Sequence, residues 1–310
     1  MCGGDTWCTK SDDGAVARCM RVESDRPSNG SDGLVAWIHT LATNGEQPHK
    51  KHRAVAEKKK PQVDFHELAD KLAKSSGAAR GRSRLSKMLG VSVESLERLH
   101  VGVGWDSYRG EEYTSWPERN GDGVVTNIVR RYWGSTGKKS MFGGAPGIYF
   151  CDDCAIMPGP VFLVEGGSDT AACRTIGVSA IGRPSNLGGI DLLASVILRE
   201  TKADRRVIVV GERDEKPEKR GTKPHCLSDC QGCLWCWPGR AGAIISAARL
   251  SSAIKRKVGW AIVPNAKDAR EWIRANTAAT PIDFISAIVD SASDVDQQTI
   301  KKYSGHSDRQ

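Results

Sequence analysis

The sequence has no long apolar run. No segment reaches the roughly 18 consecutive apolar residues that a membrane-spanning helix needs. The N-terminal segment also lacks an apolar stretch after its first basic residue, so neither a signal peptide nor a membrane partner is expected. These absences predict a cytoplasmic protein, and a reducing compartment keeps thiols free. The ten cysteines are therefore expected to bind metal rather than to form disulfides.

Acidic residues are outnumbered. The chain has 37 Asp and Glu against 45 Lys and Arg, which gives a formal charge of +8. This excess of positive charge indicates a polyanionic partner, and nucleic acid is the first candidate. With 310 residues, the chain is long enough for two or more domains, each with its own core.

Residues 161–181, VFLVEGGSDTAACRTIGVSAI, carry the pattern around which the chain is organised. The first four are apolar and typical of a strand buried in a parallel sheet. The strand ends at Glu165, two glycines allow a tight turn, and Ser168 or Asp169 can cap the helix that follows. A second apolar strand begins at Val178. This unit places a carboxylate at the C-terminal end of a strand, where open α/β sheets carry their chemistry.

The same pattern occurs twice more along the chain. In 206–214, RVIVVGERD, an apolar strand runs through a glycine into Glu212 and Asp214, which share a face of an extended chain. A third strand over 258–263 is followed by Asp268. Clustered carboxylates repel each other and are tolerated mainly where a hard cation compensates them. The three strand ends therefore predict a site for Mg²⁺ or Mn²⁺.

These segments resemble the Toprim domain, which primases, topoisomerases and some nucleases share. The resemblance covers about 155–275 and rests on EGGSD, the acid pair, the Pro238-Gly239 start of a helix, and KDAREW. AIGRPSN makes it most similar to DNA primases of the phage and plasmid type. The resemblance implies an α/β fold with a Toprim-type parallel sheet flanked by helices.

The resemblance also implies an activity and its partners. It implies a DNA primase, a nucleotidyltransferase that makes short RNA primers on single-stranded DNA from ribonucleoside triphosphates. A separate replicative helicase is the implied protein partner.

Each acid has an implied role in such an enzyme. Glu165 corresponds to the catalytic acid, which acts as general base or positions the nucleotide. Glu212, Asp214 and Asp268 correspond to the metal ligands, and all four acids are expected around the magnesium ion. The acid pair departs from the usual Asp-x-Asp, because Glu212 stands in the first place. Since glutamate is one methylene longer, Asp214 is the safer ligand.

Residues 1–44 contain a first group of cysteines, Cys2, Cys8 and Cys19. The resembled primases carry an N-terminal zinc ribbon, and this segment is similar to one that has lost its first Cys-x-x-Cys member. A tetrahedral zinc site needs a fourth ligand, for which His39 is the nearest candidate. A ribbon completed by upstream residues, a degenerate ribbon and three unrelated thiols are the alternatives.

The next segments change character twice. Residues 45–62 are polar and basic and are predicted to be a linker. Residues 63–150 correspond to the N-terminal subdomain of the resembled primases. They begin with a helix-turn-helix pattern broken at Gly90 and continue with strands, including one over 124–132 after a turn at 120–123.

The strand-rich part of this subdomain is basic. In the resembled primases such residues line the cleft facing the Toprim sheet, where they hold template phosphates and the incoming triphosphate. The implied binding residues are Arg130, Arg131, Lys138, Lys139 and, from KDAREW, Lys267. An exposed, solvated basic strand is the alternative. Single-stranded DNA is expected to stack on Trp105, Trp116 or Trp133.

A second cysteine group lies in an insertion, residues 222–238, of the predicted Toprim domain, residues 155–277. The group consists of Cys226, Cys230, Cys233 and Cys236. Four thiols within eleven residues are improbable by chance. A compact zinc site is the first interpretation, with His225 or the pair Cys151 and Cys154 contributing. An iron–sulfur cluster is the second, since closely spaced thiolates also suit one.

Residues 278–310 predict one amphipathic helix over 281–289 and then a polar tail. No P-loop follows, so a fused helicase motor is not expected.

Two rival functions stay open. A Toprim nuclease would use the same acids with water as the attacking group. A non-catalytic protein that binds single-stranded nucleic acid would bind metal without turnover.

Overall fold

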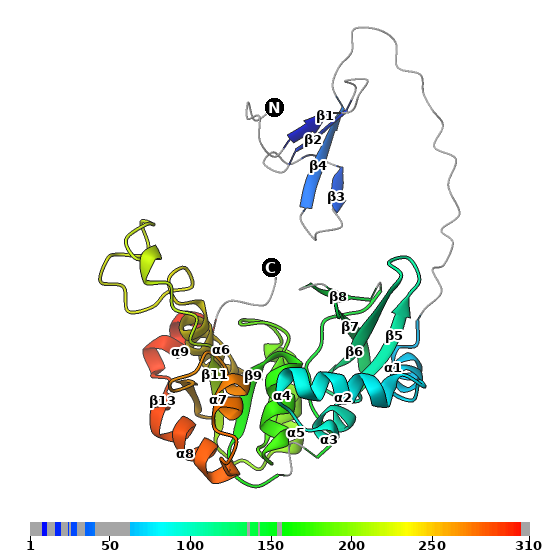
Figure 1. Cartoon of the computed structure of the whole chain (residues 1–310). Helices are drawn as coiled ribbons and strands as arrows, with labels where there is room; N and C mark the ends of the chain where they lie inside the picture. The colour runs from blue at the N-terminus through cyan, green and yellow to red at the C-terminus, as the bar shows by residue number, and fades with distance from the viewer. Residues whose placement is uncertain are drawn as a thin grey trace. The chain divides into compact units, whose positions relative to one another are not determined.

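The computed structural model of the chain describes residues 8–10, 16–19, 24, 26–29, 35–40, 63–134, 137–141, 143–153 and 157–304. The chain divides into two compact units, Met1–Lys60 and Pro61–Gln310 (Figure 1). The division falls inside the predicted linker, whose residues lie outside those described. Within the described ranges, no helix has both the length and the apolar character needed to cross a bilayer.

The first unit contains a four-stranded antiparallel sheet. Its strands are β1 (Cys8–Lys10), β2 (Val16–Cys19), β3 (Pro27–Asn29) and β4 (Val35–Thr40), in the order β1-β2-β4-β3. Ala17 and Cys19 are buried on the same face of β2. A sheet this small buries little apolar surface, and modules of this size commonly need a metal or a disulfide.

The second unit begins with three helices, α1 (Phe65–Ala73), α2 (Ala78–Leu89) and α3 (Val93–Arg98). Asp64 caps α1, because its carboxylate accepts hydrogen bonds from two backbone N–H groups at 2.9 and 3.0 Å. Gly90 ends α2 with a φ of +70°, a left-handed value that glycine adopts without steric penalty. The predicted break at Gly90 is confirmed.

An antiparallel sheet follows these helices. Its strands are β5 (Gly102–Asp106), β6 (Glu111–Arg119), β7 (Val125–Tyr132) and β8 (Lys138–Ser140), paired in chain order. Ile128 packs with Phe65 and Leu72 of α1. Trp116 and Val129 belong instead to the main core of the unit. One face of the sheet therefore holds α1, and the other meets the parallel sheet.

A five-stranded sheet forms the centre of the second unit, in the order β10-β9-β11-β12-β13. The first four strands in this order are parallel. The parallel strands and their helices are β9 (Val161–Glu165), α4 (Gly166–Thr175), β10 (Ala180–Arg183), α5 (Ile190–Glu200), β11 (Val207–Gly211), α6 (Pro238–Ile254), β12 (Val258–Ile262) and α7 (Ala269–Ala275). Phe162, Leu163 and Ile208 are fully buried, as expected of strands covered on both faces. The predicted parallel sheet flanked by helices is confirmed.

The strand order reverses at β9. From β9 the chain crosses to β10 on one side and then returns to β11 on the other. The carboxyl ends of β9 and β11 thus border the point at which open α/β sheets bind ligands. Helix α4, which leaves β9, packs against α7, which follows β12 (Figure 1). The ends of three strands are therefore brought to one place.

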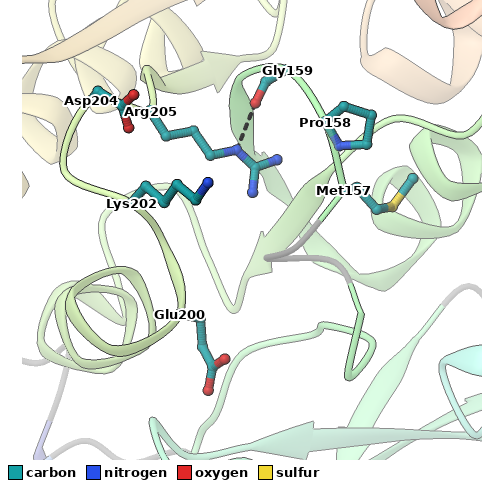
Figure 2. Close-up of a pocket in the computed structure, with 7 residues that line it drawn as sticks. All are labelled: Met157, Pro158, Gly159, Glu200, Lys202, Asp204 and Arg205. Atoms are coloured by element: carbon teal, nitrogen blue, oxygen red, sulfur yellow. Dashed lines mark hydrogen bonds between the residues drawn. The ribbon is translucent and has the colours of Figure 1, made fainter.

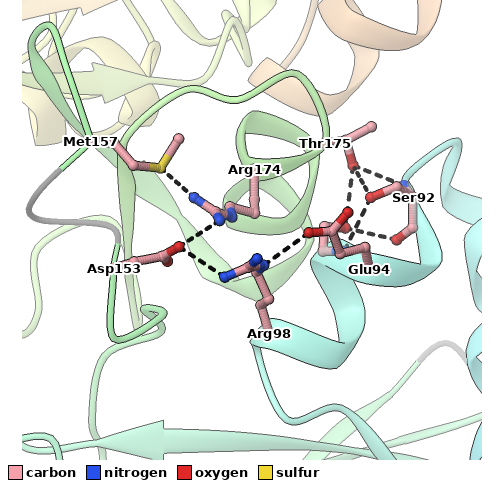
Figure 3. A network of polar contacts seen from close by, with 8 residues as sticks. Ser92, Glu94, Arg98, Asp153, Met157, Arg174 and Thr175 are labelled. Atoms are coloured by element: carbon pink, nitrogen blue, oxygen red, sulfur yellow. Dashed lines mark hydrogen bonds and ion pairs between the residues drawn. The ribbon is translucent and has the colours of Figure 1, made fainter.

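A polar network fastens the first helices to α4 (Figure 3). Asp153 accepts hydrogen bonds from Arg98 at 2.9 Å and from Arg174 at 2.6 Å, and so joins α3 to α4. The hydroxyl of Thr175 accepts a hydrogen bond from the backbone N–H of Ser92 at 2.8 Å. The helical segment and the parallel-sheet segment are accordingly parts of one unit.

The C-terminal segment is more structured than its polar composition predicts. Helix α8 (Pro281–Ser291) begins at a capping box formed by Thr280 and Asp283. Strand β13 (Ser293–Asp294) then pairs antiparallel with β12, and α9 (Gln297–Tyr303) follows. The polar tail expected after 289 thus supplies a short strand that covers an edge of the sheet.

Candidate functional site

Two glycines set the direction of the chain after the first acid. Glu165 is the last residue of β9, and Gly166 follows with a φ of +74°. Gly167 lies under an aromatic ring, since a Cβ there would come within 2.6 Å of the indole of Trp116. Both positions therefore require glycine. The turn leads directly into α4, which carries Asp169 in its first turn.

Three carboxylates meet at the C-terminal ends of the parallel strands. Asp169 comes from α4, Glu212 follows β11, and Asp268 caps α7; one oxygen of each lies within 4.8 Å of the others. Asp169 and Asp268 are only 4% and 5% exposed. We call these three residues the acid cluster.

Burial and mutual repulsion raise the pKa of two members of the acid cluster. The pKa of Asp169 lies well above its usual value, first because of burial and then because of the charges of Asp268 and Glu212. Burial also raises the pKa of Glu212, as does the charge of Glu165, while Lys267 opposes the shift. Closely spaced carboxylate oxygens of this kind fit a hard divalent cation such as Mg²⁺, whose charge would offset the repulsion.

Two basic side chains lie at the edge of the acid cluster. The Nζ of Lys267 is 4.0 Å from Oε2 of Glu212, and the side chain is 60% exposed. The Nη2 of Arg270 is 3.3 Å from Oδ2 of Asp268. Because Lys267 is exposed, it can also reach an anionic ligand above the cluster.

Arg183 is a third cation near the acids, and the sequence assigned it no role. It ends β10 and is fully buried, and it donates hydrogen bonds to the carbonyls of Val210, at 3.1 Å, and Asn186. Burial lowers its pKa, while the charges of Glu165, Glu212 and Asp169 oppose that effect. The sequence signal for this position of Arg183 is that an arginine ends the short apolar strand AIGR.

The structure brings together two of the four predicted magnesium ligands, Glu212 and Asp268. Glu165 and Asp214 lie close enough to raise the pKa of Glu212, but neither belongs to the acid cluster. One oxygen of Asp214 accepts a hydrogen bond from the backbone N–H of Gly239 at 2.8 Å, so this side chain holds the start of α6. The expectation that Asp214 is the safer ligand of the pair stays a prediction.

Asp169 is the member of the acid cluster that the sequence interpretation missed. The pattern predicts it only as a possible helix cap, whereas α4 begins three residues earlier, at Gly166. Asp169 therefore lies inside the first turn, four residues after Glu165. The spacing of four between two acids, which is one helical turn, is the signal that could have identified it.

Arg131 lies on the face of the antiparallel sheet that meets the parallel sheet. It lines a small pocket together with Trp116, Val129, Tyr149 and the first turn of α4. Burial lowers its pKa, and the charge of Arg270 lowers it further. Arg131 is therefore close to Arg270, one of the two basic residues beside the acid cluster.

Arg130 lies on the other face of the same strand. Its Nη1 is 2.9 Å from Oδ2 of Asp106, and its guanidinium lies over the rings of Tyr113 and Tyr132. These contacts tie Arg130 into its own sheet, away from the acid cluster. Two neighbouring arginines with the same predicted use thus have different surroundings, because successive residues of a strand point to opposite faces.

Strand β8 supplies the other two predicted phosphate-binding residues. Its backbone register pairs Lys138 with Arg131 and Lys139 with Arg130. The side chains of both lysines lie outside the described part of the chain. Their use in binding stays a prediction.

The three tryptophans proposed as stacking platforms differ in exposure. Trp116 is buried, and its indole N–H donates to the hydroxyl of Thr114 at 3.2 Å. Trp133 is half-buried beneath Arg84, whose guanidinium carbon is 4.2 Å from the ring centroid. Trp105 is 64% exposed. The expectation is therefore wrong for Trp116, and Trp105 offers the most accessible ring of the three.

A further pocket lies at the amino-terminal ends of β9 and β11 (Figure 2). Its lining carries charges of both signs, from Glu200, Lys202, Asp204 and Arg205, and Arg205 donates a hydrogen bond to the carbonyl of Gly159 at 2.6 Å. The acid cluster lies at the opposite ends of these strands. A mixed lining of this kind does not favour a polyanionic ligand.

The four thiols of the insertion converge. The Sγ atoms of Cys226, Cys230, Cys233 and Cys236 all lie within 4.8 Å of one another. Within the described residues, neither His225 nor Cys151 joins this group, so the expected help from them is wrong. Cys154 lies outside the described residues. A cysteine tetrad of this kind could bind a metal, and zinc is its commonest occupant.

The structure describes only some of the residues predicted to bind zinc in the N-terminal segment. Cys8 pairs with Cys19 in the register of β1 and β2, and His39 pairs with Ala17, two residues from Cys19. Cys2 and the side chain of Cys8 lie outside the described residues. Zinc binding by this set stays a prediction.

Comparisons with known proteins identify the fold. No protein-family model matches the sequence, and no curated protein matches it either. The E. coli primase catalytic core is similar, with 15% identity, a TM-score of 0.53, and coverage of 74% of this chain and 80% of that one. The DnaG primase catalytic domain bound to single-stranded DNA shows 15% identity, a TM-score of 0.51, and coverage of 74% and 78%.

A third similar structure includes an additional domain. The zinc-binding and RNA polymerase domains of the Aquifex aeolicus primase show 14% identity and a TM-score of 0.53, over 76% of this chain and 61% of that one. At such identities the likeness shows the fold alone. The chain therefore has the fold of primase catalytic cores, as the resemblance predicted, while the phage or plasmid type stays a prediction.

Proposed function

We propose that this chain is a primase-like nucleotidyltransferase that makes short RNA primers on single-stranded DNA from ribonucleoside triphosphates. The acid cluster carries the proposal. Carboxylates from three separate elements meet at the C-terminal edge of a parallel sheet, in a chain with the fold of primase catalytic cores. Transfer of a nucleotide from a triphosphate commonly requires such a cation-binding group beside the phosphates.

The acid cluster would hold Mg²⁺ or Mn²⁺, which when bound neutralises charge on the triphosphate. The carboxylate of Asp268 is oriented before any ligand arrives, because its Oδ1 accepts a hydrogen bond from the backbone N–H of Glu271 at 2.7 Å. Glu165, at the end of β9 and outside the cluster, is assigned to remove the proton of the primer 3′-hydroxyl or to orient the nucleotide.

Basic residues around the cluster would bind the phosphates of template and nucleotide. Lys267 is exposed beside Glu212, and Arg131 faces the parallel sheet near Arg270. Arg130 is assigned instead to stabilising the antiparallel sheet through Asp106. Single-stranded DNA is the proposed template, and a separate replicative helicase is the proposed protein partner.

Incubation of the full chain with single-stranded DNA, ribonucleoside triphosphates and Mg²⁺ distinguishes the three candidate functions. A primase yields oligoribonucleotides, a nuclease shortens the template, and a binding protein does neither. Asp169→Asn should lower incorporation by at least about 100-fold, because it removes a cation ligand. The matched control is Asp191→Asn, an exposed acid in the first turn of α5, which should keep wild-type activity. A wild-type chain that binds template and cation but incorporates no ribonucleotide would refute the proposal.

A further inference from the structure

The insertion between β11 and α6 is built around its thiols. We call residues 215–237 the cysteine lobe; its described secondary structure before α6 is one 3₁₀ turn, Pro217–Lys219, and an isolated β-bridge between Lys223 and Cys226. Cys226 and Cys236 are fully buried, while Leu227 and Leu234 are 65% and 45% exposed. Among the described residues, no side chain of the lobe belongs to either hydrophobic core cluster. Apolar burial therefore does not explain why the lobe is ordered, and small segments of this kind usually need a metal or a disulfide.

The spacing of the thiols fits one tetrahedral ion. The Sγ of Cys236 lies 3.7 Å from the Sγ of Cys233 and 3.7 Å from that of Cys230. Zn–S bonds of about 2.3 Å in a tetrahedron place the sulfurs about 3.8 Å apart. A disulfide would need about 2.05 Å between two sulfurs. A cluster of several irons binds its thiolates on different metal atoms and would hold them farther apart.

The end of the cysteine lobe contacts the segment just after β11, which carries Glu212. The backbone N–H of Lys216 donates to the carbonyl of Cys236 at 2.7 Å, and the backbone N–H of Trp237 donates to the carbonyl of Cys233 at 2.8 Å. The indole N–H of Trp237 then donates to the carbonyl of Glu212 at 3.4 Å. Two thiol-bearing residues are thus one or two hydrogen bonds from the acid cluster.

The start of α6 packs closely on the same segment. A Cβ at Gly239 would come within 2.2 Å of the carbonyl oxygen of Glu212, and the N–H of Gly239 donates to Asp214. This contact leaves little space for movement. The position of α6, which follows Cys236 by two residues, therefore sets the position of Glu212.

We propose that Cys226, Cys230, Cys233 and Cys236 bind one structural Zn²⁺, and that this ion holds the turn before α6 against Glu212 and so positions the acid cluster for its divalent cation. The second part rests on the proposed function only in taking the acid cluster as a cation site. The zinc and the acid cluster have no ligand in common. Cys233 and Cys236 act on Glu212 through the backbone and Trp237.

Metal analysis of the purified full chain tests the zinc site. Cys230→Ser should lose one equivalent of zinc relative to wild type, whatever the N-terminal segment binds. His225→Ala is the matched control, since this exposed neighbour lies outside the tetrad, and it should keep the full zinc content. Co²⁺ substituted into the wild-type chain should give the strong visible absorption of a tetrahedral thiolate site. Equal zinc in Cys230→Ser and wild type, or no such absorption, would overturn the site.

Binding of Mn²⁺, followed by electron paramagnetic resonance without nucleotides, tests the link to the acid cluster. Cys230→Ser should bind Mn²⁺ about tenfold more weakly than wild type, a typical cost of losing a supporting contact around a metal site. Trp237→Phe keeps every thiol and should weaken Mn²⁺ binding while leaving zinc content unchanged. Trp237→Phe therefore tests whether the cysteine lobe influences Mn²⁺ binding at the acid cluster, even where Cys230→Ser fails to fold. Unchanged Mn²⁺ affinity in a folded Trp237→Phe variant would refute the link. A chain that binds both metals as expected and makes no RNA would refute only the primase proposal.

Discussion

The acid cluster and the cysteine lobe are two candidate metal sites built in opposite ways. The acid cluster stands at the ends of fully buried strands, so the sheet brings its carboxylates together despite their repulsion. The cysteine lobe has exposed leucines and two fully buried thiols, so on the zinc proposal its order depends on what the thiols bind. On the two proposals above, the fold creates the metal site in the first region, and the metal stabilises the fold in the second. Removing metal should therefore affect the two regions differently.

The largest expected effect is on the cysteine lobe. Zinc-selective chelation should open the lobe and raise its rate of cleavage by trypsin by about two orders of magnitude, because metal binding supplies its folding free energy. Lys219 and Arg220 provide the cleavage sites, since Lys216 and Lys223 each precede a proline, where trypsin does not cut. Mass spectrometry of the fragments is the measurement. Simultaneous cleavage throughout the parallel sheet would contradict the distinction between the two regions.

A smaller effect is expected within the acid pair. Glu212→Asp restores the usual Asp-x-Asp pattern but withdraws the carboxylate by one methylene from Asp169 and Asp268. Mn²⁺ affinity should fall about tenfold. Asp214→Asn should have a weaker effect, since an amide oxygen still accepts the hydrogen bond from Gly239. Titration of Mn²⁺ into both variants checks the order, and a stronger loss in Asp214→Asn would reverse the roles of the two acids.

Substitution of the two arginines of β7 tests whether the face of the strand on which a residue lies decides if it binds the template or the nucleotide. Arg131→Ala should raise the KM for the ribonucleotide or the template about tenfold without a change in stability. Arg130→Ala should leave both KM values unchanged and lower the free energy of unfolding by about 1–2 kcal/mol, since it removes a charge-assisted bond to Asp106. Kinetics and denaturant titration of the pair make the comparison. Equal effects on KM would show that the template reaches both faces.

The smallest effect concerns pH. The folded-state pKa values of Asp169 and Glu212 are raised, so protonation favours the folded, metal-free chain. This stabilisation is complete below the usual values of 3.8 and 4.5 and is lost as the pH rises through the raised values. In chelator at neutral pH, Asp169→Asn should therefore melt at a higher temperature than wild type, and the difference should shrink on acidification. A difference in Tm that is independent of pH would contradict the buried-charge explanation.

Much of the fold could be predicted from local patterns. The apolar runs that end in acids predicted β9, β11 and β12, and Gly90 predicted the break between two helices. These features depend on residues close together in the chain. The strand and helix after 289 were missed, because a two-residue edge strand is stabilised by its partner β12 rather than by its own sequence.

Less of the candidate site than of the fold could be predicted from local sequence patterns. Asp169 was missed because its role depends on where α4 begins, and Arg183 because its position depends on three strands packing around it. The separation of Arg130 from Arg131 required knowledge of which face of β7 meets the parallel sheet.

By itself, the sequence determined the kinds of chemistry present, namely carboxylates at strand ends, thiols at close spacing and a basic subdomain. It also determined the local backbone, through glycines and helix caps whose effects extend over a few residues. Only the tertiary structure decided which three acids share one position, because Asp169, Glu212 and Asp268 are tens of residues apart and meet only through strand order and helix packing. Repulsion between such groups means that the packed sheet, and not their mutual affinity, holds them together.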